Sequence, residues 1–143
     1  MYSFKNDYSE GCYPSILKKL EETNYKQQES YGDDEYSLQA KDFIREKIGN
    51  AKADVHFISG GTQANLTVIA SVLRPHESVI CASVGHINVH EAGSIEATGH
   101  KINAVERIDG KLRVEDIENV LNEHVIIPHM VKPKICLLYT SDA

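Results

Sequence analysis

Two neighbouring glycines lie in a segment with the features of an anion-binding turn. The run SGGTQAN at residues 59–65 follows a β-prone run, VHFIS at 55–59, and precedes a helical pattern. Gly60 and Gly61 carry no Cβ, so the backbone can turn sharply and approach a ligand closely. The N–H groups that open the helix lack intrahelical partners and favour phosphate. The alternative is a plain turn with Thr62 as the N-cap that binds nothing. The run is neither GxGxxG nor a P-loop.

Two histidines follow the next β-prone run along the chain. His86 and His90 stand four residues apart in SVGHINVHEAGS (83–94), with Glu91 beside the second. Three interpretations stay open for them. His86 stacks as a flat ring on a planar cofactor, or the pair binds a metal from one helix face, or both side chains are simply solvated. The spacing is that of HExxH, but Ile87 stands where that motif has glutamate, and no third ligand is evident.

Two further residues are candidates for chemistry. Tyr31 lies in the acidic run ESYGDDEYS at 29–37, which we interpret as a loop that is either solvated or reaches into an active site. His129 comes just before the last expected strand, at 133–139. That is the end of the strand away from the expected crevice, so the position favours a solvated histidine unless the loop folds back.

Alternating strand and helix patterns predict an α/β fold with a mostly parallel sheet and helices on both of its faces. The expected strands are 55–59, 78–82, 101–106 and 133–139. The expected helices are one that begins at Pro14, one that ends at Gly49, one that stops before Pro75, and two at 87–98 and 113–124. We therefore divide the chain into an N-terminal arm with two helices, residues 1–53, and a partial α/β domain, residues 54–143.

Composition narrows the class of protein. The chain has 143 residues, about one domain's worth, with 41% hydrophobic and 25% charged residues, as in soluble globular proteins. A formal net charge of -6 argues against nucleic acid as the main partner. No apolar run reaches the roughly 18 residues of a membrane span, and the N-terminus does not read as a signal peptide. The 3 cysteines form no CxxC pair, so we expect neither a disulfide framework nor a cysteine zinc site. We expect the protein to be cytoplasmic.

Four motifs in this order resemble one family. YGDD (31–34), SGGTQAN (59–65), GHINVHEAG (85–93) and ATGHKI (97–102) are similar to segments of the low-specificity threonine aldolases. These enzymes belong to the β-eliminating lyases, which use pyridoxal 5'-phosphate and have the aspartate-aminotransferase fold, fold type I. The resemblance covers about residues 3–135. It implies that this chain is the N-terminal part of a fold-type-I large domain, and that the domain is incomplete here.

The resemblance assigns roles to individual residues. It places the cofactor phosphate in the GGTQAN turn, on the residues Gly60, Gly61, Thr62 and Gln63. It makes His86 the residue that stacks on the pyridine ring, with Glu91 and Gly93 matching a glutamate and a glycine that follow it. It implies a catalytic role for His129 on the substrate hydroxyl, and substrate contacts for Tyr31 and, through a looser match, Asn6. His90 departs from the pattern, because relatives often have an aromatic residue there.

The implied reaction is a retro-aldol cleavage of threonine or allo-threonine into glycine and acetaldehyde. A base removes the β-hydroxyl proton while the cofactor accepts the electrons of the broken carbon–carbon bond. A histidine suits the base role because its ordinary pKa lies near neutrality. The resemblance also implies a small amino acid as the substrate and a homodimer or homotetramer with active sites between subunits.

Three groups that the family requires have no match here. The Schiff-base lysine, the acidic partner of the pyridine nitrogen and the arginine for the substrate carboxylate all fall beyond residue 143 in relatives. The ending CLLYTSDA resembles translated sequencing adapter, so we expect residues from about 136 or 137 to 143 to be non-native; the alternative is a real β-strand with a short polar tail. We therefore expect a fragment that is inactive alone and poorly soluble, with an open sheet edge. The alternatives are another fold-type-I β-eliminating lyase, or a non-enzymatic α/β module that binds a phosphorylated small molecule.

Overall fold

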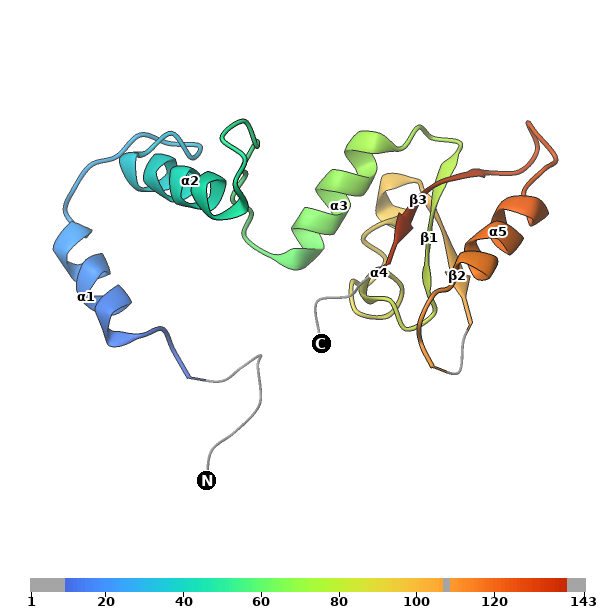
Figure 1. Ribbon diagram of the computed structural model, residues 1–143, viewed down its shortest axis with the longest axis horizontal. Coiled ribbons are helices and arrows are strands. Elements are labelled where there is room, and N and C mark those ends of the chain that lie inside the picture. The colour runs from blue at the N-terminus through green and yellow to red at the C-terminus, as the bar shows by residue number, and fades with distance from the viewer. Residues whose placement is uncertain (1–9, 107–108, 139–143) are drawn as a thin grey trace, which may run out of the picture. The chain divides into compact units, whose positions relative to one another are not determined.

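The computed structural model describes residues 10–106 and 109–138, and the chain divides into two units, Met1–Phe57 and Ile58–Ala143. Figure 1 labels the helices and strands in chain order. In the first unit, α1 spans Pro14–Thr23 and α2 spans Glu35–Ile48. Proline suits the first turn of α1 because the N–H group that it lacks would have no helical partner there. Both helices confirm the predictions made from apolar spacing.

The start of α2 corrects the predicted extent of the acidic loop. The carboxylate of Asp34 accepts hydrogen bonds from the backbone N–H of Ser37 at 2.8 Å and from its hydroxyl at 2.6 Å. Asp34 is thus the N-cap of α2, and these bonds, the hydroxyl's first, lower the pKa of its carboxyl. The loop predicted at 29–37 is therefore too long, because its last three residues form the first turn of the helix.

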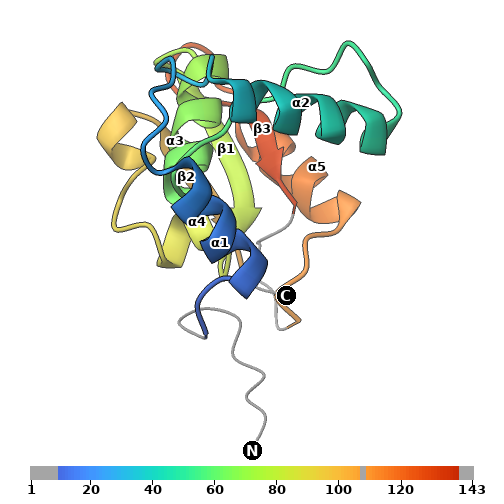
Figure 2. The same ribbon diagram turned by 90° about the vertical axis from the view of Figure 1, so that its left-hand side faces the viewer.

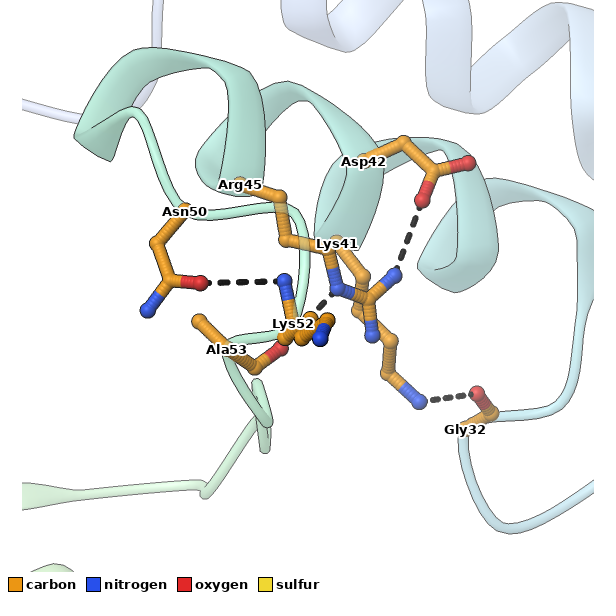
Figure 3. Close-up of polar contacts among 7 residues, drawn as sticks. All are labelled: Gly32, Lys41, Asp42, Arg45, Asn50, Lys52 and Ala53. Atoms are coloured by element: carbon orange, nitrogen blue, oxygen red, sulfur yellow. Dashed lines mark hydrogen bonds and ion pairs between the residues drawn. The ribbon is translucent and has the colours of Figure 1, made fainter.

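Long basic side chains fasten α2 to the loops on either side of it. The guanidinium of Arg45 binds the carboxylate of Asp42 at 2.8 Å and donates from Nε to the carbonyl of Ala53 at 2.9 Å, as Figure 3 shows. On the same helix, Lys41 donates from Nζ to the carbonyl of Gly32 at 2.9 Å. The loops before and after α2 are thereby tied to the helix itself.

The second unit is built around a parallel three-stranded sheet. Its strands are β1 (Glu77–Ala82), β2 (Lys101–Val105) and β3 (Lys132–Leu137), in the order β2-β1-β3. Both neighbours pair with β1 in parallel. The strands lie between the helices α3 (Gly61–Val72) and α5 (Val114–Glu123) in Figure 1, and Figure 2 shows β1 and β3 between the same two helices. The predicted α/β fold, with a parallel sheet and helices on both faces, is confirmed.

The central strand and the helices around it supply the core. One cluster of its buried apolar side chains contains Ile69, Leu73, Val79, Cys81, Ile87 and Ile95. Strand β1 is buried along nearly its whole length, as expected for the middle strand of a parallel sheet covered on both faces. The core therefore fixes the segment that leaves the carboxyl end of β1. Along the parts of the chain that the structure describes, no helix has the length and apolar character needed to cross a membrane.

The strand predicted at 55–59 is wrong. This segment has no strand geometry, most of its residues are exposed, and it contains the boundary between the two units. Among the described residues, the sheet has β1, β2 and β3 as its members. A β-prone composition becomes a strand only when a neighbouring strand supplies backbone partners.

The helix predicted at 87–98 is also wrong as a single element. The structure has a short helix, α4 (His86–Val89), and then a 3₁₀ turn, η1 (Glu96–Thr98). Between them, Ala92 and Gly93 adopt left-handed backbone angles, with φ of 49° and 76°. Left-handed residues cannot continue a right-handed helix, so the chain turns there.

Candidate functional site

The glycine turn forms the N-terminus of α3. Gly60 is the N-cap, with extended φ of -171° and ψ of 160°, and Gly61 is the first helical residue. The N–H of Ala64 donates to the carbonyl of Gly60 at 3.0 Å. The N–H groups of Gly61, Thr62 and Gln63 come before this first helical bond, so the helix does not use them. The interpretation of Thr62 as the N-cap is wrong, because the chain enters the helix two residues earlier.

The space beside the two glycines is open. A Cβ built on Gly60 or Gly61 would meet no described atom within 4 Å, and neither residue has a positive φ. Neither local packing nor backbone strain therefore requires glycine at these positions. A remaining physical reason for glycine at both positions is that a ligand can approach the backbone N–H groups closely.

The side chain of Gln63 stabilises the glycine turn by hydrogen bonds to the residue before it. Its Oε1 accepts hydrogen bonds from the hydroxyl of Ser59 at 2.6 Å and from the backbone N–H of Ser59 at 3.3 Å. This arrangement is close to a capping box, in which a residue in the first helical turn reaches back to the segment before the helix. Sequence reasoning missed Ser59, although a glutamine three residues after the N-cap was the available signal.

A second group of polar side chains meets at the carboxylate of Glu91. Its Oε1 accepts a hydrogen bond from Asn65 Nδ2 at 2.6 Å and lies 2.8 Å from His86 Nδ1. Its Oε2 accepts a hydrogen bond from the Ser94 hydroxyl at 2.6 Å. Asn65 belongs to α3 and His86 opens α4, so this carboxylate joins the helix of the glycine turn to the histidine segment.

The hydrogen bonds to the buried carboxylate of Glu91 decide its charge and the proton position on His86. Its side chain is 0% exposed, and that of His86 is 22% exposed. Burial opposes ionisation, but the hydrogen bonds from Ser94, Asn65 and His86 outweigh it and lower the pKa of Glu91. An ionised carboxylate can only accept, so His86 Nδ1 is the donor of their shared hydrogen bond.

The second histidine stands apart from this group. His90 is exposed, and its ring centroid lies 5.5 Å from that of His86 with the ring planes inclined at 50°, which is not a stacked pair. Within residues 10–106 and 109–138, no three His, Cys, Asp or Glu side chains come together in an arrangement suited to a metal ion. One observed partner of His86 is the carboxylate of Glu91.

His129 lies far from His86 within one chain. It precedes β3, and the neighbouring bond from Lys132 N to the carbonyl of His76, at 2.9 Å, places this end of β3 beside the start of β1. His86 follows the carboxyl end of β1. A six-residue strand is about 20 Å long, so the structure does not bring the two histidines together.

The two expected substrate contacts belong to the first unit. Tyr31 is 99% exposed and has a left-handed φ of 60°, so its phenol is accessible to solvent. Asn6 lies outside the described residues. The roles of both residues stay predictions.

Asn65 and Ser94 are functional candidates that sequence reasoning did not single out. Asn65 is part of the SGGTQAN run, but it lies 26 positions before Glu91. Such a separation gives no signal without the fold. Ser94 is three residues after Glu91, a sequence separation at which a hydroxyl can donate a hydrogen bond to a carboxylate across a turn.

The second unit is thus an α/β structure whose polar side chains gather at the carboxyl end of its central strand, where open α/β sheets bind their ligands. Residues 12–143 match the sequence model of the beta-eliminating lyases, and the chain belongs to this family.

Relatives of known activity agree with that family. The chain is 30% identical over 134 residues to the low specificity L-threonine aldolase of a Pseudomonas species (strain NCIMB 10558), covering 92% of this chain and 38% of the relative. It is 28% identical over 137 residues to the enzyme of the same description from Pseudomonas aeruginosa, covering 94% and 39%. A solved structure of Leishmania major threonine aldolase matches with a TM-score of 0.88 and 49% identity, over 95% of this chain and 40% of that one. The chain therefore spans about two fifths of the length of these relatives.

Proposed function

We propose that this chain supplies the phosphate-binding turn and the ring-contacting histidine of a pyridoxal 5'-phosphate site, in a lyase that cleaves threonine or a similar β-hydroxy amino acid. The observation that carries the proposal is the bond between Asn65 and Glu91. It joins the helix of the glycine turn to the histidine segment in one polar group. The names and activities of the threonine aldolase relatives support the choice of substrate.

The residues at the turn fit a phosphate. The N–H groups of Gly61, Thr62 and Gln63 precede the first hydrogen bond of α3, and a helix N-terminus carries a partial positive charge. The open space at both glycines lets phosphate oxygens approach those N–H groups. Thr62 adds a hydroxyl donor. When bound, the cofactor supplies the electron acceptor for the bond that breaks.

His86 is assigned to hold the plane of the cofactor ring. Its Nδ1 proton is engaged by Glu91, which limits rotation of the imidazole. The carboxylate is itself held by Ser94 and Asn65, so the ring orientation is set before any ligand arrives. A ring positioned in advance loses less conformational entropy when a planar ligand binds.

His129 is assigned to proton removal from the substrate hydroxyl, through contact with a second copy of the chain. Within one chain it lies at the opposite end of β1 from His86. The assignment therefore requires a homo-oligomer in which His129 reaches the site of a neighbouring copy. Tyr31, exposed on the first unit, is retained as a proposed contact of the substrate, together with Asn6.

The experiment uses the protein expressed from its complete gene. Acetaldehyde release from threonine and allo-threonine tests the aldolase reaction, and a tyrosine or tryptophan substrate tests the other β-eliminating lyases. His86→Ala is expected to weaken cofactor binding, measured by absorbance titration, while His90→Ala serves as the matched control on the same segment. If the protein binds the cofactor but releases no acetaldehyde, the aldolase assignment is wrong, while the assignment to the beta-eliminating lyase family still holds.

Subunit mixing tests the role of His129 separately. His86→Ala and His129→Ala proteins are each expected to be inactive, and mixed oligomers are expected to regain part of the activity. Recovery follows because some sites then receive an intact His86 from one copy and an intact His129 from the other. An absence of recovery in oligomers shown to be mixed contradicts the intersubunit assignment.

A further inference from the structure

Asn65 makes the hydrogen bond that joins α3 to the segment after β1. Its Nδ2 donates to Glu91 Oε1 at 2.6 Å, across 26 residues of sequence. Asn65 is the fifth residue of α3, one turn beyond Gly61. The amide thus extends from the helix of the glycine turn to the carboxylate that holds His86.

The carboxylate of Glu91 is fixed at both of its oxygens. Oε1 takes the bond from Asn65 and the contact with His86 Nδ1, and Oε2 takes the bond from Ser94. Ser94 also binds Glu91 through the backbone, since its N–H donates to the Glu91 carbonyl at 3.1 Å. Ser94 therefore fixes the carboxylate within its own turn, and Asn65 ties it to a different element.

We propose that Asn65 is a positioning residue for His86, acting through the carboxylate of Glu91. The amide N–H of Asn65 holds Glu91 Oε1 in the position where this oxygen accepts a hydrogen bond from His86 Nδ1. The neutral imidazole is thereby kept in the Nδ1–H tautomer with one ring orientation. Asn65 also sets the position of that ring relative to the glycine turn, because the amide belongs to the same helix.

The burial of Glu91 makes its hydrogen bond from Asn65 costly to lose. The Glu91 side chain has no exposed surface, so water cannot replace a missing donor. A buried carboxylate that loses one of its partners must move, bind a proton or draw more strongly on the remaining donors. Each of these responses changes the hydrogen bond to His86, which is the measurable consequence of the proposal.

The first test reads the tautomer directly, without a cofactor. Nitrogen-15 chemical shifts of His86 are measured in the ¹⁵N-histidine-labelled full-length protein, with the His86→Gln variant used to assign the signals. We expect a protonated Nδ1 and an unprotonated Nε2 in the neutral ring. A protonated Nε2 as the main tautomer overturns the proposal, and this measurement requires no change at Asn65.

The second test removes the donor. Asn65→Leu keeps the number and branching of the side-chain heavy atoms but cannot donate, and we expect the His86 nitrogen shifts to move toward those of a free imidazole mixture. Asn88→Ala is the control, because the Asn88 amide binds the backbone carbonyl of Ser83 at 2.7 Å and not Glu91. Unchanged His86 shifts in a folded Asn65→Leu protein overturn the proposal, as does an equal shift in the control.

The link to the cofactor rests on the proposed function and is measured separately. We expect Asn65→Leu to weaken pyridoxal 5'-phosphate binding by about 10- to 100-fold, by analogy with the loss of the outer partner of a metal-binding histidine. If the unaltered protein does not bind the cofactor, the proposed function fails while the tautomer result still decides the role of Asn65. If it binds and Asn65→Leu binds equally well, the positioning role toward the cofactor is rejected.

Discussion

His86 Nδ1 lies 2.8 Å from Glu91 Oε1, and the carboxylate that accepts its proton is shielded from solvent. Hydrogen bonds lower the pKa of Glu91 below its ordinary value, despite burial. A group with a lowered folded pKa stabilises the fold above its unfolded pKa and loses that contribution as the pH falls through the folded value. The histidine segment is therefore held more firmly at neutral pH than at acidic pH.

We predict that Glu91→Gln lowers the free energy of unfolding at pH 7 by about 1–3 kcal/mol, because a charged acceptor of three side-chain donors is lost. The variant should also lose less stability than the unaltered protein between pH 5 and pH 3, a window around the ordinary Glu pKa of about 4.5. Urea unfolding across this range measures both effects. Glu118→Gln, at an exposed position of α5, is the control. Parallel pH profiles for all three proteins would falsify the assignment.

The core beneath the histidine segment should be sensitive to truncation. Ile95 has no exposed surface and packs in the same cluster as Ile87 of α4. We predict that Ile95→Ala lowers the free energy of unfolding by about 2–5 kcal/mol, through lost burial and the cavity that remains. Val89→Ala, at an exposed position of α4, should change it by about 0.5 kcal/mol or less. Chemical denaturation of both variants provides the comparison, and a similar loss in the two contradicts the assigned core.

Apolar periodicity and turn residues were sufficient to predict most elements. Helix α2 illustrates this, because its spacing and the terminal Gly49 were both visible in the sequence. The strand pattern was equally reliable where a partner existed, as for β1 between its two neighbours. It failed at residues 55–59, since whether a β-prone run pairs depends on distant parts of the chain.

The candidate site was predicted only in part. His86 and the glycine turn were found because their residue types carry chemistry at a recognisable position after an element. Asn65 was missed because its importance comes from a contact with Glu91, and that contact exists only after α3 packs beside the segment following β1. The left-handed Ala92 had no sequence signal, although the turn it forms helps bring Ser94 back to Glu91.

Thiol reactivity should separate the cysteines by their environment. Burial raises the pKa of Cys81 to about 11, and it also raises the pKa of Cys136. Cys12 is exposed. Because the thiolate is the reactive form, we predict that iodoacetamide at pH 8 modifies Cys12 first and Cys81 last, as read by peptide mass spectrometry. In urea the order should disappear. Early labelling of Cys81 in the folded protein is incompatible with its buried position in β1.

Two glycines near the site should differ in how much stability the same substitution removes. A Cβ on Gly85 would lie 2.8 Å from the carbonyl oxygen of Ala82 and 3.3 Å from Cys81 Cβ, both at the carboxyl end of β1. We therefore predict that Gly85→Ala lowers the free energy of unfolding by about 1–3 kcal/mol, as overpacking does. Gly60→Ala has open space and an extended backbone, but alanine is a poorer N-cap than glycine, so the free energy of unfolding should fall by about 1 kcal/mol or less.

The same pair separates folding from ligand binding. If the backbone of the glycine turn receives the cofactor phosphate, the methyl group of Gly60→Ala occupies the path of the ligand, and the affinity for pyridoxal 5'-phosphate should fall although the fold is intact. Thermal unfolding and absorbance titration of the two variants supply the measurements. Full cofactor affinity in a stable Gly60→Ala protein would mean that the phosphate does not approach this residue. The open space beside the turn would then require a different explanation.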